Sequence, residues 1–202
     1  MKSLFRLWKV FLQSTFAAPK RKPFRRRQKR SLAPSFSPLE PRKLLAGAEI
    51  VVNAVHDSPE LDFTDSLVTI REAVHLANES DDARITFAPE VNGHTIAVDT
   101  ELVVEGNVQI DSFFDITISG ENQTRVFHVV ENASLDVDGI TIADGAADAG
   151  AAIRNDGNLS VKNATFTRNS ASFGGAILNT GSMRVEDSLF VENAAELWGS
   201  SI

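Results

Sequence analysis

The chain lacks several features that define common protein classes. Its 202 residues contain no cysteine, which excludes disulfides, iron–sulfur clusters and thiolate catalysis. No run of 18 or more apolar residues occurs, so no transmembrane helix is predicted. No proline follows Pro89, and a proline-free stretch rich in Gly, Asn, Val and Ile favours continuous β-sheet. The four histidines are far apart, without the spacing typical of zinc ligands: His56, His75, His94 and His128.

Charge is divided unevenly along the chain. Residues 1–46 carry 13 lysines and arginines and one acid, Glu40, whereas residues 47–202 carry 7 basic and 26 acidic residues. The two segments therefore have net charges of +12 and −19, which together give the −7 of the whole chain. This division predicts a basic arm, residues 1–47, attached to a separate acidic domain.

The basic arm allows three interpretations from its residues alone. Residues 1–18 place apolar side chains at helical spacing among basic ones, and residues 19–30 hold eight basic residues in twelve. The arm could be a targeting segment, although a standard signal peptide places its basic cluster before the apolar core. It could bind nucleic-acid phosphates nonspecifically, or it could be a solvated, disordered tail.

A short motif stands at the end of the basic arm. Its residues are Leu39, Glu40, Pro41, Arg42, Lys43, Leu44, Leu45 and Ala46. This run resembles the LEPR-xLL motif that follows an Arg-rich N-terminus in many large bacterial surface and secreted proteins. The resemblance implies export to the cell envelope or beyond, and it favours the targeting interpretation over specific nucleic-acid binding.

The acidic domain shows self-similarity with a period of 24 residues. Residues 149–172 and 173–196 are identical at nine aligned positions: Gly150/Gly174, Ala152/Ala176, Ile153/Ile177, Asn155/Asn179, Gly157/Gly181, Val161/Val185, Phe166/Phe190, Asn169/Asn193 and Ala171/Ala195. Each repeat holds three short runs of alternating apolar and polar residues, a pattern typical of strands. Three such strands cannot bury their apolar faces alone, so each is expected to pair with its equivalent about 4.8 Å along the stack. The sequence therefore predicts an all-β fold, a parallel β-helix.

The repeat also predicts which side chains stack inside the helix. Four inward columns are expected: Val129, Ile153 and Ile177; Leu135, Leu159 and Met183; Val137, Val161 and Val185; and Ile142, Phe166 and Phe190. Ile116 and Ile118 precede Ile140 and Ile142 by 24 residues, which indicates one further coil. In the turns, Asn155 over Asn179 and Asn169 over Asn193 are expected to form amide ladders.

The repeats carry a second resemblance. Gly174-Gly175-Ala176-Ile177 and Phe190-Val191-Glu192-Asn193 are similar to the GGAI and FxxN signatures of chlamydial-type polymorphic outer-membrane protein repeats. A second copy reads GAAI at residues 150–153 and FTRN at residues 166–169. The resemblance implies a right-handed β-helix at the outer membrane or outside the cell, often in adhesion, and it brings no enzymatic residues with it.

The two ends of the predicted helix differ. Residues 48–103 are expected to form an N-terminal cap, in which Thr69 and Glu72 make a capping box for a helix at about 69–78. Strands are expected beside it at residues 49–53 and 84–87. Residues 104–202 are assigned to the coils, and residues 198–202 resemble 173–177, so the last coil is expected to be incomplete. An open C-terminal coil of this kind could self-associate.

The exterior offers few groups suited to catalysis. The outward column of Asp138, Lys162 and Glu186 alternates in sign, and it is interpreted as a structural charge ladder. Asp144 and Asp148 together could bind calcium weakly. Arg154 and Arg168 are candidate bases only by analogy with lyases. His128 aligns with Ala152 and Ala176, and it is interpreted as a packing or turn residue.

These observations favour an exported bacterial cell-surface or extracellular β-helix module with a structural or adhesin-like, non-catalytic function. No catalytic, metal or cofactor site is predicted, and its ligand would be a surface molecule or glycan. Two alternatives remain open: a polysaccharide lyase or hydrolase on the same fold, and nucleic-acid binding through residues 19–30.

Overall fold

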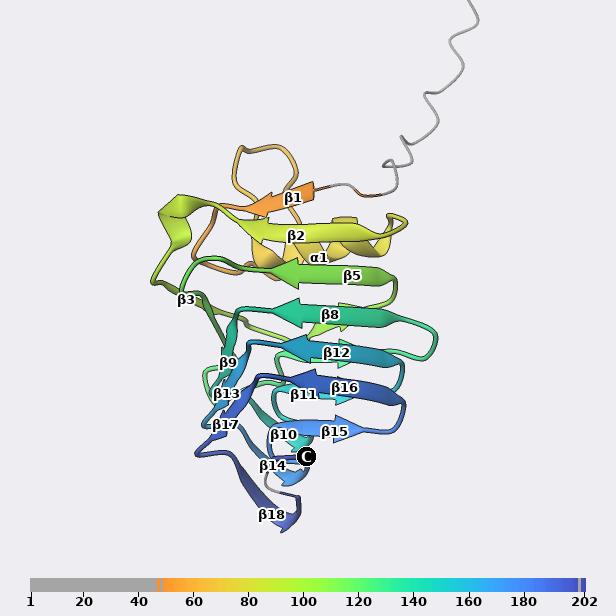
Figure 1. The fold of residues 1–202 in the computed structure, drawn as a ribbon. Helices are drawn as coiled ribbons and strands as arrows, with labels where there is room; N and C mark the ends of the chain where they lie inside the picture. The colour runs from red at the N-terminus through yellow and green to blue at the C-terminus, as the bar shows by residue number, and fades with distance from the viewer. Residues whose placement is uncertain (1–46, 48, 200) are drawn as a thin grey trace, which may run out of the picture. The chain divides into compact units, whose positions relative to one another are not determined.

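A computed structural model describes residues 47, 49–199, 201 and 202 (Figure 1). The predicted export motif and the basic arm before residue 47 lie outside the described residues. The described elements, in chain order, are β1 (Glu49–Val52), α1 (Ile70–Asn78), β2 (Ala83–Phe87), the 3₁₀ helix η1 (Pro89–Val91), β3 (Thr95–Ala97), β4 (Leu102–Val104), β5 (Asn107–Asp111), β6 (Thr117–Ser119), β7 (Phe127–Val129), β8 (Ser134–Asp138), β9 (Thr141–Ala143), β10 (Ala146–Ala149), β11 (Ile153–Asn155), β12 (Asn158–Lys162), β13 (Thr165–Thr167), β14 (Ser170–Phe173), β15 (Ile177–Asn179), β16 (Ser182–Glu186), β17 (Leu189–Val191) and β18 (Ala194–Trp198).

The strands wind into a parallel β-helix, as the sequence predicts. Sheet A has the order β1-β2-β5-β8-β12-β16, sheet B β17-β13-β9-β6-β3, sheet C β15-β11-β7-β4 and sheet D β10-β14-β18. Every pairing between these described strands is parallel. Figure 1 shows the strands of sheet A one above another, each belonging to a successive coil.

Three of the four predicted inward columns are confirmed by the strand register. Leu135, Leu159 and Met183 pair in turn, as do Val137, Val161 and Val185, and also Ile142, Phe166 and Phe190. The rings of Phe166 and Phe190 stack with their centroids 4.7 Å apart. Because equivalent apolar side chains lie directly over one another, the interior is a continuous hydrophobic core.

The fourth predicted column is wrong at its first member. Phe127, not Val129, pairs with Ile153, and Val129 pairs with Asn155. The cause is a turn of unequal length: residues 130–133 separate β7 from β8, whereas only residues 156 and 157 separate β11 from β12. These two extra residues shift β7 against the 24-residue period, and the alignment of His128 with Ala152 fails for the same reason.

Each complete coil from residue 134 onward contains one more strand than the three predicted. The additional strands form sheet D, which is built from small residues in β10 and β14. These segments read AADA and SASF, and neither shows the alternation by which the other strands were recognised.

Left-handed backbone conformations recur at the turns with the period of the coil. Asp144, Arg168 and Glu192 have φ angles of 50°, 53° and 56°, although none of them is glycine. At Gly181 a side chain is excluded by the neighbouring coil, since a Cβ there would lie 2.0 Å from the carbonyl oxygen of Gly157. The left-handed turn position is therefore set by the geometry of the coil whatever residue occupies it, whereas the repeated Gly157 and Gly181 reflect close contact between coils.

The predicted N-terminal cap helix is confirmed. The Thr69 hydroxyl accepts a hydrogen bond from the Glu72 N–H, and the Glu72 carboxylate accepts one from the Thr69 N–H. The buried face of α1 packs against strands β1, β2, β4 and β5, so the helix covers the apolar interior at this end. No helix among the described residues is long and apolar enough to cross a membrane.

Candidate functional site

Charged side chains gather on the outer face of sheet C. The outward positions of its four strands hold Val103, His128, Arg154 and Leu178, which pair with one another from coil to coil. The His128 cluster is defined here as Glu101, Arg125, His128, Arg154 and Asp156. Glu101, Arg125 and Asp156 are more than 20 positions apart in the sequence. The stacking of β4, β7 and β11 brings the five residues together.

Asp156 is the centre of the hydrogen bonds in the His128 cluster. Its carboxylate accepts from Thr180 Oγ1 at 2.7 Å and from Arg154 Nε at 2.9 Å, and it lies 3.0 Å from His128 Nε2. The bond from Thr180 is the main cause of a pKa of about 2 for Asp156, with further lowering by His128 and Arg154. The carboxylate is therefore ionised at neutral pH.

An ionised Asp156 fixes the orientation of the histidine ring. A carboxylate only accepts hydrogen bonds, so Nε2 of His128 is assigned as the donor. In the neutral ring, Nδ1 is then left as an acceptor, and it lies 3.9 Å from the nearer oxygen of Glu101. The histidine side chain is about one-fifth exposed, so Nδ1 is within reach of a ligand on this face.

Arg125 holds Glu101 beside the histidine. Its guanidinium group donates to the carboxylate of Glu101 and to the carbonyl oxygens of Ala149 and Gly150. These contacts join three successive coils, and they leave Arg125 mostly buried. Arg125 is therefore a positioning residue, whereas Arg154 is more exposed and only its Nε is bonded to Asp156.

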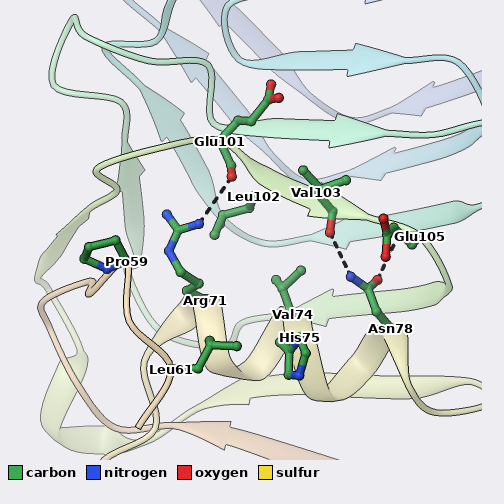
Figure 2. Close-up of a pocket in the computed structure, with 10 residues that line it drawn as sticks. All are labelled: Pro59, Leu61, Arg71, Val74, His75, Asn78, Glu101, Leu102, Val103 and Glu105. Carbon is green, nitrogen blue, oxygen red and sulfur yellow. Dashed lines mark hydrogen bonds between the residues drawn. The ribbon is translucent and has the colours of Figure 1, made fainter.

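A groove adjoins the His128 cluster where α1 meets β4 (Figure 2). Its volume is about 270 Å³, and it is lined by Pro59, Leu61, Arg71, Val74, His75, Asn78, Glu101, Leu102, Val103 and Glu105. Because Glu101 belongs to both, the groove and the His128 cluster form one continuous surface, called here the sheet C surface.

The walls of the groove are held by hydrogen bonds across the helix–strand junction. The Asn78 amide donates to the Val103 carbonyl and accepts from the N–H groups of Glu105 and Gly106. Arg71 donates to the carbonyl oxygen of Glu101, as Figure 2 shows, and forms an ion pair with Asp57. The groove is thus preformed, and its lining combines apolar side chains with carboxylates and an imidazole.

The outer face of sheet A carries the predicted charge ladder only in part. Lys162 Nζ lies 3.5 Å from a carboxylate oxygen of Glu186, but Asp138 accepts its hydrogen bond from Asn163 instead. Burial raises the pKa of Asp136, with a smaller contribution from the negative charge of Asp111.

The other candidates from the sequence have structural partners. Asp144, considered as a weak calcium ligand, forms a two-point ion pair with Arg168. The predicted amide ladders are confirmed, since Asn155 donates to Asn179 and Asn169 donates to Asn193. Within residues 47–202, so far as they are described, no three His, Asp or Glu side chains form a group that could hold a metal ion.

Sequence reasoning missed the His128 cluster. It considered His128 and Arg154 separately, because the 24-residue alignment places His128 beside Ala152. The turn at residues 130–133 is two residues longer than its equivalent in the next coil. An alignment that allowed for these two residues would have placed His128 beside Arg154 and so indicated the cluster.

Comparisons with known proteins add nothing to this geometry. No protein-family model, curated protein or solved structure matches the chain.

Proposed function

We propose that the chain is an exported bacterial β-helix module that acts at the cell surface or outside the cell, in a structural or adhesin-like role. Two observations support export: the LEPR-xLL-like run at residues 39–45, and the GGAI and FxxN signatures of the last two repeats. The parallel β-helix is the fold that these signatures imply. A solenoid of this kind offers a long, rigid wall on which binding residues can be displayed.

The sheet C surface is the proposed binding surface, and the single observation that carries this assignment is the preformed groove beside α1. Leu61, Val74 and Val103 give the groove apolar surface, while Glu101, Glu105 and His75 also line it and carry hydrogen-bonding groups. A sugar ring has an apolar face and a polar edge, so this arrangement suits a monosaccharide unit of a surface glycan.

Glycan binding is tested with a pair of matched variants. The purified chain would be applied to a panel of immobilised bacterial and host glycans, together with Val103→Arg and Val51→Arg. Val103 lines the groove, whereas Val51 lies on β1, away from it, and is 44% exposed. We expect Val103→Arg to reduce binding at least tenfold and Val51→Arg to leave it unchanged. Equal binding by all three proteins would contradict the assignment.

A polysaccharide lyase is the second candidate function, and the His128 cluster favours it. Asp156 orients His128 so that Nδ1 is left to accept a proton, and Arg154 could neutralise the carboxylate of a uronic acid. In the elimination, the proton beside that carboxylate moves to Nδ1 and its electron pair forms a carbon–carbon double bond. The glycosidic carbon–oxygen bond breaks, and the leaving oxygen takes a proton from water.

Lyase activity is measured as the release of unsaturated uronides from acidic glycans. If the chain is a lyase, His128→Gln should lose at least 100-fold in rate. The matched variant His94→Gln should keep full activity, because His94 is exposed and contacts only the nearby Asn92 carbonyl oxygen among the polar groups. No uronide release by the wild-type chain, with glycan binding retained, would leave the non-catalytic proposal as the better account.

A further inference from the structure

A second pocket lies on the outer face of sheet A, where β5, β8 and β12 end. Its volume is about 280 Å³, and it is called here the sheet A pocket. Among the residues that line it are Arg84, Asp111, Ser112, Phe113, Asp138 and Asn163. Ser112 and Phe113 follow β5, and Asn163 follows β12, so successive coils contribute to one site. In Figure 1 the arrowheads of these strands point to the edge of sheet A at which the turns lie.

An exposed aromatic ring stands beside this pocket. Phe113 is 94% exposed, the largest exposed fraction among the large hydrophobic side chains that the structure describes. The turn between β5 and β6 spans residues 112–116, whereas the equivalent turns of the next two coils have only two residues each. Phe113 belongs to this longer turn. A single exposed apolar residue is ordinary on a protein surface, but this one lines a pocket that otherwise consists mainly of hydrogen-bonding groups.

The turn that carries Phe113 is held on both sides of the ring. The Ser112 hydroxyl accepts from the N–H of Phe114 at 3.0 Å and donates to its carbonyl oxygen at 2.9 Å. The Ser112 N–H donates to the carbonyl oxygen of Asp138 in the next coil, and Phe114 packs against the core. Gly139 lies close beneath, since a Cβ there would lie 2.3 Å from the Ser112 carbonyl oxygen. Because the backbone is fixed, little conformational entropy is lost when a ligand binds against the ring.

Planar polar side chains form the rest of the pocket, and they keep hydrogen-bonding capacity. Arg84 donates from Nε to Asp111 at 2.7 Å, and Asn163 donates from Nδ2 to Asp138 at 2.8 Å. These bonds fix the orientation of the four groups. Each carboxylate has a second oxygen, and the guanidinium group has two further nitrogens, so acceptors and donors remain for a ligand. Arg84 is nearly half exposed, which leaves these nitrogens within reach.

The charge of this wall limits the ligands that it can accept. Asp111 and Asp138 are paired in the register of β5 and β8, and Asp136 lies on the same outward face, two residues before Asp138. Burial raises the pKa of Asp136, and the negative charge of Asp111 also raises this pKa, so Arg84 does not fully neutralise the face. Like charges that are brought together cost free energy. An anionic ligand such as a uronic acid is therefore disfavoured here.

We propose that the sheet A pocket binds a neutral hexose unit of a glycan, with the Phe113 ring against the apolar face of the sugar. Sugar hydroxyls donate to the carboxylates of Asp111 and Asp138 and accept from the terminal nitrogens of Arg84. An aromatic wall with a few fixed polar groups is the combination that such a ring requires. This site is separate from the groove beside α1. On an immobilised glycan the two sites act together, so loss of either one weakens binding by more than half.

Amide chemical shifts of the full 202-residue chain test the location and the charge preference of the site. Soluble tetrasaccharides of glucose, mannose and galactose would be titrated one at a time, with the tetrasaccharide of galacturonic acid as the charged counterpart of the last. We expect at least one neutral tetrasaccharide to shift the amides of residues 111–113, 138, 139 and 163, and the galacturonate to leave them unchanged. Amides of residues 101–105 report on the groove beside α1, so success or failure at each surface is recognised separately.

A matched pair of variants tests the role of the aromatic ring. Phe113→Ala should lower the affinity followed at the amides of residues 138 and 139 by about tenfold or more, because the apolar contact with the sugar is lost. Leu67→Ala removes an exposed apolar side chain outside both pockets, and it should bind as the wild type does. Circular dichroism confirms that both variants are folded. No shift with any neutral tetrasaccharide, unchanged affinity in Phe113→Ala, or tighter binding of the galacturonate would each overturn the proposal.

Discussion

At the scale of single residues, the buried asparagines are the strongest polar determinants of the stack. Asn169 is fully buried, donates to the Ile142 carbonyl and to Asn193, and accepts from the Gly145 N–H. Its side chain therefore satisfies backbone groups of the turn in the coil before it. Asn193 makes equivalent bonds at the open end but is only partly buried.

Replacing Asn169 with alanine should reveal this difference. Asn169→Ala leaves a buried N–H and a buried carbonyl without partners, so we expect it to lower the free energy of unfolding by about 2–4 kcal/mol. Asn193→Ala should cost less, because water can reach its partners. Urea unfolding of both variants measures the difference, and equal losses would contradict the burial argument.

The charge on Asp156 predicts a pH dependence of stability. Its folded pKa of about 2 lies below the value of about 3.9 expected in the unfolded chain, so its contribution is present above pH 4 or so. That contribution is lost as the pH falls through about 2. Asp156→Asn should therefore be less stable than the wild type at neutral pH, and the gap should close on acidification. Urea titrations of both proteins check this, and a gap that stays constant would contradict it.

At the scale of elements, each coil is stabilised by the one that covers it. Phe166 is enclosed between Ile142 and Phe190, whereas Phe190 has a neighbour on one side only. Phe166→Ala should therefore cost about 3–5 kcal/mol of unfolding free energy. Phe190→Ala should cost clearly less, because no described strand pairs with β17 on its other side. Equal costs in thermal or urea unfolding would show that the last coil is as well covered as the one before it.

The sequence was sufficient to predict the elements whose pattern repeats. The period of 24 residues holds from β8 to Ala195, and there the columns and the amide ladders agree with the structure. Beyond Ala195 the register shifts by one residue, so that Phe173 pairs with Trp198. The period also holds between β6 and β9, where Ile118 pairs with Ile142 as predicted. It fails at β7, because the turn at residues 130–133 is longer than its later equivalent, and at β5, because five residues separate β5 from β6 but only two separate β8 from β9. Sheet D was missed because short strands of Ala and Ser have no apolar alternation.

The candidate site could not be predicted in the same way. The His128 cluster contains no repeated motif, and its residues come together only through the register of sheet C. The groove depends on the packing of α1 against β4. A capping box predicts that residues 70–78 form a helix, but it does not predict which strand that helix packs against. Local chemistry thus identified the helix, whereas the surface it forms required three-dimensional structure.

At the scale of the whole molecule, the β-helix separates stability from function. Inward side chains build the core. Outward side chains alternate with them along each strand, and they are free to vary without disturbing that core. The core columns and the sheet C surface use opposite faces of the same strands, so ligand binding can be altered without loss of the fold. Val103→Arg should therefore leave the circular dichroism spectrum and the unfolding midpoint close to those of the wild type.

The most direct test of the proposed role is the location of the chain in its own cell. Fractionation into cytoplasm, outer membrane and medium, with sequencing of the mature N-terminus, is the measurement. We expect the chain outside the cytoplasm and accessible to protease on intact cells, and we expect Arg42→Ala with Leu44→Ala and Leu45→Ala to retain it inside. An intact basic arm on a chain confined to the cytoplasm would contradict the account.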